Sequence, residues 1–208
     1  MNNQPANTAE ERLPVMEHYY TIQGEGYNTG KPAYFIRLGG CDVGCVWCDV
    51  KESWDAQKHT LYPVEQITGW VVESKSPNVV VTGGEPLMYN LDALCESIHQ
   101  KGVKTFLETS GAYALSGKWD WICVSPKKFK PALRETLENA DELKVVVYHK
   151  SDFEWALQHA QRVKRGCRLF LQPEYSVFNQ VMPLIIDFVK NHPEWRISLQ
   201  THKMMQIP

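Results

Sequence analysis

The chain has 208 residues, with 22 lysines and arginines against 24 aspartates and glutamates, a formal net charge of −2. This balance argues against general nucleic-acid binding, because that requires a basic surface. Hydrophobic residues make up 43% of the chain but form no run of 18, so we expect neither a transmembrane segment nor a membrane partner. A polar beginning without an apolar signal segment predicts a cytoplasmic protein.

Residues 1–13 are polar and predict a disordered tail, so we expect a single domain over residues 14–208. Within this domain, β-rich segments alternate with segments of helical periodicity. The predicted strands cover residues 15–22, 33–38, 79–81, 103–107, 121–124, 143–147, 169–171 and 195–199. The predicted helices cover residues 63–74, 91–98, 153–163 and 178–189, the last with Pro183 in its first turn.

This alternation predicts an α/β fold with a mostly parallel sheet. A complete (β/α)8 barrel takes about 250 residues, which is more than this chain offers. Residues 49–60 are polar and irregular, and residues 110–119 lack a helical pattern although they connect two predicted strands. We therefore expect an incomplete, open (β/α) barrel that carries its functional residues at the carboxyl ends of the strands.

Three of the six cysteines lie close together, as Cys41, Cys45 and Cys48. Thiolates at this Cys-x3-Cys-x2-Cys spacing suit zinc or an iron–sulfur cluster. Both centres normally take four protein ligands, and no fourth cysteine or histidine lies nearby at a typical spacing. A 4Fe–4S cluster held by three cysteines would leave one iron open for a small molecule. The remaining cysteines lie in apolar patterns and are interpreted as packing residues: Cys95, Cys123 and Cys167.

The cysteine loop, with Trp47 before its third cysteine, resembles that of the radical S-adenosylmethionine (SAM) enzymes. Further segments resemble the 7-carboxy-7-deazaguanine synthases, a radical SAM family of queuosine biosynthesis. These segments run through nearly the whole chain and are weak singly but specific in this order: residues 20–26, 35–38, 82–86, 108–111, 125–127 and 200–203.

The resemblance implies a lyase that converts 6-carboxy-5,6,7,8-tetrahydropterin to 7-carboxy-7-deazaguanine with loss of ammonia, in a pathway of tRNA modification. A 4Fe–4S cluster would reduce SAM, and the resulting 5′-deoxyadenosyl radical would abstract hydrogen from the substrate. No residue is then expected to be catalytic beyond the cluster and SAM. The same resemblance implies a homodimer and an electron donor such as flavodoxin or ferredoxin.

The resemblance also assigns individual residues. Cys41, Cys45 and Cys48 would hold the cluster. Arg37 would pair with the substrate carboxylate, because a guanidinium binds carboxylates through two parallel hydrogen bonds. The SAM-binding residues would be Gly84, Glu85, Glu108, Ser125, Pro126, Lys127 and Gln172. The substrate-binding residues would be Ile22, Gln23, Gly24, Arg37, Thr82 and Pro208.

One position departs from the family pattern. Val50 stands where the family usually has a threonine whose hydroxyl binds magnesium, so the use of magnesium stays open. Two other functions also stay open. A radical SAM activase of a glycyl-radical partner protein shares the cysteine loop but leaves Arg37 and residues 23–26 unexplained. A non-catalytic zinc-binding interaction module would explain the cysteines alone.

Overall fold

A computed structural model of the protein describes residues 11–208 and places all their strands in one nine-stranded sheet of order β3-β1-β2-β4-β5-β6-β7-β8-β9. The strands are β1 (Arg12–Ile22), β2 (Pro32–Leu38), β3 (Thr60–Pro63), β4 (Asn78–Gly83), β5 (Lys104–Thr109), β6 (Trp121–Val124), β7 (Glu142–Val147), β8 (Arg168–Pro173) and β9 (Trp195–Ile197). The α-helices are α1 (Val64–Glu73), α2 (Asp92–His99), α3 (Arg134–Asn139), α4 (Asp152–Ala160), α5 (Phe178–Asn191) and α6 (Thr201–Met205).

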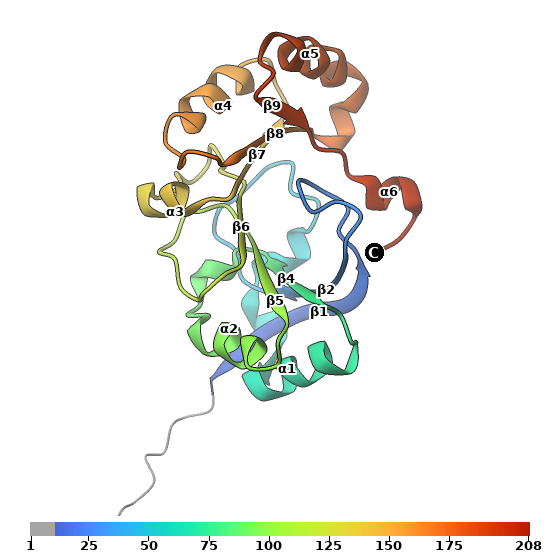
Figure 1. The fold of residues 1–208 in the computed structure, drawn as a ribbon, viewed down its shortest axis with the longest axis vertical. Coiled ribbons are helices and arrows are strands. Elements are labelled where there is room, and N and C mark those ends of the chain that lie inside the picture. The colour runs from blue at the N-terminus through green and yellow to red at the C-terminus, as the bar shows by residue number, and fades with distance from the viewer. Residues whose placement is uncertain (1–10) are drawn as a thin grey trace, which may run out of the picture.

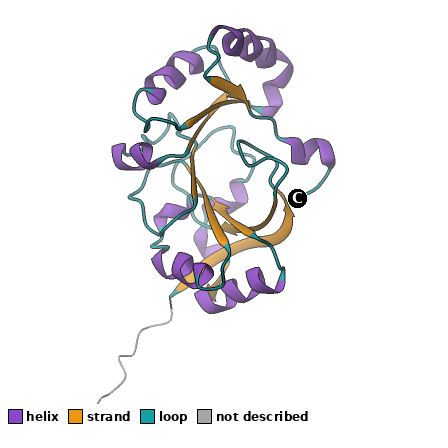
Figure 2. Cartoon of the chain, in the orientation of Figure 1, coloured by secondary structure: helices purple, strands orange, loops and turns teal. Residues whose placement is uncertain are grey.

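The sheet is mostly parallel, as the sequence predicts. β1 runs antiparallel to both of its neighbours, whereas every pair from β2–β4 to β8–β9 is parallel. The sheet curves without closing, so β3 and β9 remain its two edges (Figure 1). Helices lie around the outside of the curve, and loops fill its inside (Figure 2). The prediction of an open (β/α) barrel is confirmed.

The two faces of the curved sheet differ in chemistry because successive strand residues point to opposite sides. The outer face packs its apolar residues against the helices, as Ile36 and Leu143 do in the main core with Ile67 of α1 and Leu94 of α2. Burial of each such side chain stabilises the fold by about 1.5–3 kcal/mol. The inner face carries a small apolar layer and, nearer the carboxyl ends of the parallel strands, the polar residues Arg37, Thr82, Glu108, Lys144 and Gln172.

The boundaries of several elements differ from the predictions. Residues 1–10 of the predicted tail lie outside the described residues, but Arg12 and Leu13 belong to β1, where Leu13 is buried and pairs with Tyr62. β3 and α3 were not predicted, because four and six residues are too short to show a clear period. The last strand ends at Ile197 instead of residue 199, and α6 follows it.

The position of Pro183 is a further correction. Helix α5 begins at Phe178, directly after the 3-10 turn Tyr175–Val177, so Pro183 lies in its second turn and not in its first. Proline has no backbone N–H, so the carbonyl four residues earlier, on Asn179, lacks its helical donor. Among residues 11–208, no helix combines the length and the apolar character needed to cross a membrane.

Candidate active site

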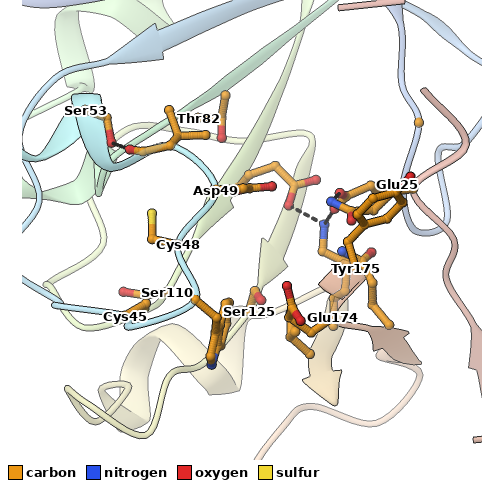
Figure 3. Close-up of a pocket in the computed structure, with 18 of the residues that line it drawn as sticks. Glu25, Cys45, Cys48, Asp49, Ser53, Thr82, Ser110, Ser125, Glu174 and Tyr175 are labelled. Atoms are coloured by element: carbon orange, nitrogen blue, oxygen red, sulfur yellow. Dashed lines mark hydrogen bonds and ion pairs between the residues drawn. The ribbon is translucent and has the colours of Figure 1, made fainter. Parts of the chain in front are cut away.

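A cavity of about 830 Å³ occupies the inside of the barrel (Figure 3). Its volume lies within the roughly 300–1,000 Å³ typical of ligand sites. Fifteen of the residues singled out from the sequence line it together: Ile22, Gln23, Gly24, Arg37, Cys41, Cys45, Cys48, Val50, Thr82, Gly84, Glu108, Ser125, Lys127, Gln172 and Pro208. Glu85 and Pro126 are not among its lining residues. The fold thus brings the two expected binding sets and the cysteines to one place.

The cysteine loop follows β2 and turns back on itself at two glycines, Gly40 with φ +101° and Gly44 with φ +74°. Glycine takes such left-handed conformations without steric cost. The Cys48 N–H donates to the Cys45 carbonyl at 3.1 Å, and the Cys41 N–H donates to the Trp54 carbonyl at 3.1 Å. These bonds keep the three cysteines on the cavity wall.

The loop offers three thiols, which are ligands that an iron–sulfur cluster takes. All six cysteines are free, and within residues 11–208 no three histidine, cysteine or acidic side chains are gathered closely enough to hold one ion. A cubane needs a wider arrangement, because each thiolate binds a different iron. Burial raises the pKa of the Cys45 thiol to about 11 and also raises that of Cys41, so metal binding has to displace their protons.

The loop after β4 packs backbone to backbone against the cysteine loop. The Gly84 N–H donates to the Leu38 carbonyl at 2.9 Å, and the Glu85 N–H donates to the Gly40 carbonyl at 2.8 Å. A Cβ atom at position 84 would lie 2.3 Å from the Gly40 oxygen and 2.7 Å from Cys41 Cβ. Only glycine allows this approach, so Gly84 places the end of β4 directly beside the first cysteine.

The side chain of Glu85, which was expected to contact SAM, is enclosed by hydrogen bonds within the protein. It is 1% exposed, and its carboxylate accepts from the Thr109 hydroxyl at 2.5 Å, the Ser110 N–H at 2.8 Å and the Leu87 N–H at 3.1 Å. The Ser110 hydroxyl also donates to it. The carboxylate therefore ties the end of β5 to the loop after β4. Its expected contact with SAM stays a prediction.

Three charged side chains form the floor of the cavity: Glu25, Glu108 and Lys144. The Lys144 ammonium lies 2.6 Å from Glu25 and 3.0 Å from Glu108. Burial opposes the charge of Glu25, but the attraction and hydrogen bond of Lys144 and the hydrogen bond of Gln200 lower its pKa to about 2. Burial likewise opposes the charge of Lys144, yet Glu108 and Glu25 raise its pKa well above the ordinary value.

The loop after β1 reaches this floor from an unexpected direction. Because β1 is antiparallel, its end at Ile22 pairs with the start of β2 at Pro32, and the loop enters at the opposite rim from the other motifs. The Gly26 N–H donates to Ser198 Oγ at 2.9 Å, and the Thr201 N–H donates to the Gly24 carbonyl at 2.9 Å. The loop thus bridges from β1 to the chain around β9, across the open side of the barrel.

This loop also depends on a buried acid at the start of β7. The Tyr27 N–H and the Trp121 indole both donate to Glu142 Oε2 at 3.1 Å, while Oε1 of Glu142 has no hydrogen-bond partner among the described residues. Burial raises the pKa of Glu142 to about 7. A Cβ atom at Gly26, whose φ is +66°, would lie 1.9 Å from that oxygen, so the loop passes directly over the acid.

The expected substrate contacts are partly engaged within the protein. Arg37 Nε donates to Glu17 at 2.6 Å, and the guanidinium also interacts with the side chain of Tyr19. The Thr21 hydroxyl donates to the Pro208 carbonyl at 3.4 Å and holds the last residue at the cavity. Lys127 Nζ donates to Ser125 Oγ at 2.6 Å, and burial lowers the pKa of this lysine.

Val50 begins the 3-10 turn Lys51–Trp54 and lines the cavity without a side-chain oxygen. Its carbonyl accepts from the Ser53 hydroxyl at 2.7 Å, and Thr82 is seen on the same side of the cavity (Figure 3). Position 50 therefore offers no side-chain ligand to a cation.

Comparisons with known proteins agree with this geometry. Residues 35–164 match the model of the radical SAM superfamily. A 7-carboxy-7-deazaguanine synthase from Flavobacterium psychrophilum is 51% identical over 95% of this chain and 94% of its own length. One from Synechocystis is 43% identical over 93% of each chain. The crystal structure of QueE from Escherichia coli aligns with a TM-score of 0.84 and 31% identity, over 92% of this chain and 95% of that one.

The chain belongs to the 7-carboxy-7-deazaguanine synthases. As a member of this radical SAM family it is an enzyme, and membership implies a 4Fe–4S cluster and SAM. The relatives do not favour the alternative of a glycyl-radical activase.

Sequence reasoning missed one charged residue of the cavity wall that a local signal could have revealed. Lys144 sits between the fully buried Leu143 and Val145, in a segment that was predicted only as a strand. In a strand, that alternation places the lysine on the face opposite its neighbours. A lysine on the inner face of a barrel strand requires partners, and these were present in the quoted motifs as Glu25 and Glu108.

Proposed function

We propose that the protein converts 6-carboxy-5,6,7,8-tetrahydropterin to 7-carboxy-7-deazaguanine with loss of ammonia, a step of queuosine biosynthesis. Family membership supports the reaction class. The observation that carries the proposal is a shared cavity of about 830 Å³, which collects the three cysteines, the expected substrate-binding residues and all of the expected SAM-binding residues except Glu85 and Pro126.

The cysteine side of the cavity would bind the cluster and SAM. Cys41, Cys45 and Cys48 supply three thiolates, and the glycine at position 84 lets the end of β4 pack directly against the cysteine loop beside them. When bound, the cluster and SAM supply the electron and the radical that the reaction needs. Glu108 accepts from ribose hydroxyls, and the remaining SAM contacts are made by Ser125, Lys127 and Gln172.

The opposite side of the cavity would bind the pterin. The terminal amino groups of Arg37 pair with the substrate carboxylate, while Glu17 orients the guanidinium from the other side. The backbone at Gln23 and Gly24 and the hydroxyl of Thr82 match the donors and acceptors along the edge of a pterin ring. Pro208 closes this side, which explains why the end of the chain folds back onto the barrel.

The remaining features of the proposal follow from the family. The enzyme is a cytoplasmic homodimer and takes its electrons from a flavodoxin or a ferredoxin. Magnesium is bound weakly, through substrate oxygens and water, because Val50 provides no oxygen and this ion tolerates water as a ligand.

The test is anaerobic reconstitution of the full chain with iron and sulfide, followed by incubation with SAM, a reductant and the carboxytetrahydropterin. Mass spectrometry should detect the product with one nitrogen fewer, and ammonia should form in equal amount. A matched reaction without SAM controls for spontaneous pterin breakdown. Cluster formation and SAM cleavage without any deazaguanine product would refute the proposed substrate. A colourless protein with one bound zinc would instead support the interaction module.

A further inference from the structure

Lys144 is a buried charge that the proposed reaction does not yet explain. Its side chain is 5% exposed, in the middle of β7. Burial of an ammonium is costly unless opposite charges and hydrogen bonds compensate it. Here the two compensating carboxylates come from distant parts of the chain, Glu25 from the loop after β1 and Glu108 from β5. The chain therefore retains an expensive ion pair at the wall of its binding cavity.

The hydrogen bonds around this lysine fix both carboxylates. Gln23 Nε2 donates to Glu108 Oε1 at 3.3 Å, and Gln200 Nε2 donates to Glu25 Oε1 at 2.8 Å. The oxygen of each amide is occupied as well, since Gln23 accepts from the Glu25 N–H at 3.1 Å and Gln200 accepts from Lys203 Nζ at 2.9 Å. Each carboxylate is thus held by an oriented amide on one side and by Lys144 on the other.

We propose that Lys144 is a positioning residue for SAM binding: its ammonium holds the Glu108 carboxylate toward the cavity, while Glu25 anchors the ammonium from the opposite side. An ionised carboxylate accepts hydroxyl donors more strongly than a neutral acid does. The inference deepens the proposed function, because it depends on Glu108 as the acceptor of the ribose hydroxyls.

Removal of the ammonium should change the protonation of the site. Two carboxylates left alone in a buried site disfavour each other's charge, so the pair should retain a proton near neutral pH. The charged and titratable groups that face Lys144 from the surrounding elements are Glu25, Glu108, Cys123, Lys127, Glu142 and His202. Because the ammonium of Lys144 lies between Glu25 and Glu108 in the native enzyme, SAM affinity should depend less on pH there than in a variant without this ammonium.

The experiment measures SAM affinity by equilibrium dialysis on the anaerobically reconstituted holoenzyme. Lys144→Met should weaken SAM binding about tenfold, the usual scale for one charge-assisted hydrogen bond. Lys144→Arg should restore part of the loss, because it returns a cation. Lys164→Met is the matched control: it removes a half-exposed lysine that pairs with Asp141 at 2.6 Å, and SAM affinity should not change.

The dependence on pH separates positioning from general support of the fold. In Lys144→Met, SAM affinity should fall as the pH decreases from 8 to 6, because the proton retained by the carboxylates replaces a charged acceptor with a neutral one. A loss that is the same at every pH, with a lowered melting temperature, would overturn the proposal in favour of a purely structural lysine.

A charge-matched variant keeps the test valid if Lys144→Met does not fold. Glu25→Gln combined with Lys144→Met removes one negative and one positive charge, so the net charge of the site is unchanged. We expect weak SAM binding, because Glu108 has lost its ammonium. Native affinity in this double variant would show that Lys144 acts only as a counter-charge and would overturn the positioning role.

Glu108→Gln distinguishes this inference from the proposed function. We expect it to weaken SAM binding about as much as Lys144→Met does, and the two changes together should cost less than their sum. Unchanged SAM affinity in Glu108→Gln would remove Glu108 from the SAM site and end the inference, whereas product formation by the native enzyme would still support the proposed reaction.

Discussion

The cysteine loop and the cavity floor lie on the same cavity but are built in opposite ways. The loop is partly open: Val46 is 69% exposed, Cys41 and Cys48 are half-buried, and the loop is held mainly by backbone bonds. The floor is closed, with Lys144 5% exposed and each of its side chains paired to another. The charged side chains of the floor are therefore already held in place by one another before any ligand binds. The cysteine side chains, by contrast, would gain their main contacts only from the cluster.

The largest effect is expected from substitutions in the cysteine loop. Replacement of Cys41, Cys45 or Cys48 by alanine should abolish activity and lower the iron content, because each thiolate would hold one iron. Cys95→Ala and Cys123→Ala are the controls: both side chains are 1% exposed, and we expect a loss of about 1–2 kcal/mol in stability with the cluster retained. Iron analysis, the visible spectrum and urea unfolding measure these outcomes. A stable Cys95→Ala protein without a cluster would contradict the ligand assignment.

The next largest effect is expected at Glu85, whose carboxylate connects the loop after β4 to the end of β5. Glu85→Ala should lower the free energy of unfolding by about 3 kcal/mol, because it leaves the buried N–H groups of Ser110 and Leu87 without an acceptor. Glu96→Ala, on the exposed side of α2, should change it by less than about 0.5 kcal/mol. Urea unfolding of both proteins provides the measurement. Equal stability of the two variants would mean that Glu85 does not stabilise the connection between these two segments in the way that its hydrogen bonds indicate.

A smaller effect is expected at the mouth of the cavity. Removal of residues 205–208 deletes Pro208 from the cavity wall together with its bond from Thr21. The substrate KM should rise about fivefold, which corresponds to roughly 1 kcal/mol. SAM cleavage without substrate should change less, because the floor and the cysteine loop remain intact. Steady-state kinetics beside an uncoupled cleavage assay separate the two, and an unchanged KM would show that the end of the chain is not part of the site.

The smallest expected effect tests position 50. The native enzyme should lose only about threefold in activity when a chelator removes magnesium, because water can replace a missing protein ligand. Val50→Thr is nearly isosteric and adds one oxygen, so it should increase the stimulation by magnesium. Turnover measured against magnesium concentration for both proteins decides this. A strict magnesium requirement that Val50→Thr leaves unchanged would show that position 50 does not govern the use of the metal.

The sequence predicts the elements that repeat a clear period, and it predicts the motifs whose residue types are chemically restricted. β2, β4, α2 and β7 are recognisable from apolar runs or helical spacing. The cysteines are recognisable because thiolates at that spacing have few other uses. Such signals are local. They indicate where a residue lies in the chain, but they do not show which distant residues it contacts.

The features that the sequence does not reveal depend on long-range geometry. The carboxylate of Glu85 looks available to a ligand until the end of β5 is placed beside it. Residues 23–26 follow a strand end, as the other motifs do, but the antiparallel direction of β1 sends them to the opposite rim. Lys144 appears to be an isolated charge until the fold brings together acids that lie 119 and 36 residues away in the chain.

The passage of Gly26 over Glu142 has a consequence for how such enzymes can diverge. Any side chain at position 26 would collide with the carboxylate below, and its left-handed backbone already favours glycine. A shorter residue at position 142 removes the collision but also removes the acceptor for Tyr27 and Trp121. A substitution at either position alone therefore disturbs the contacts of the other. The path of the loop across the open side of the barrel depends on Gly26 and Glu142 together.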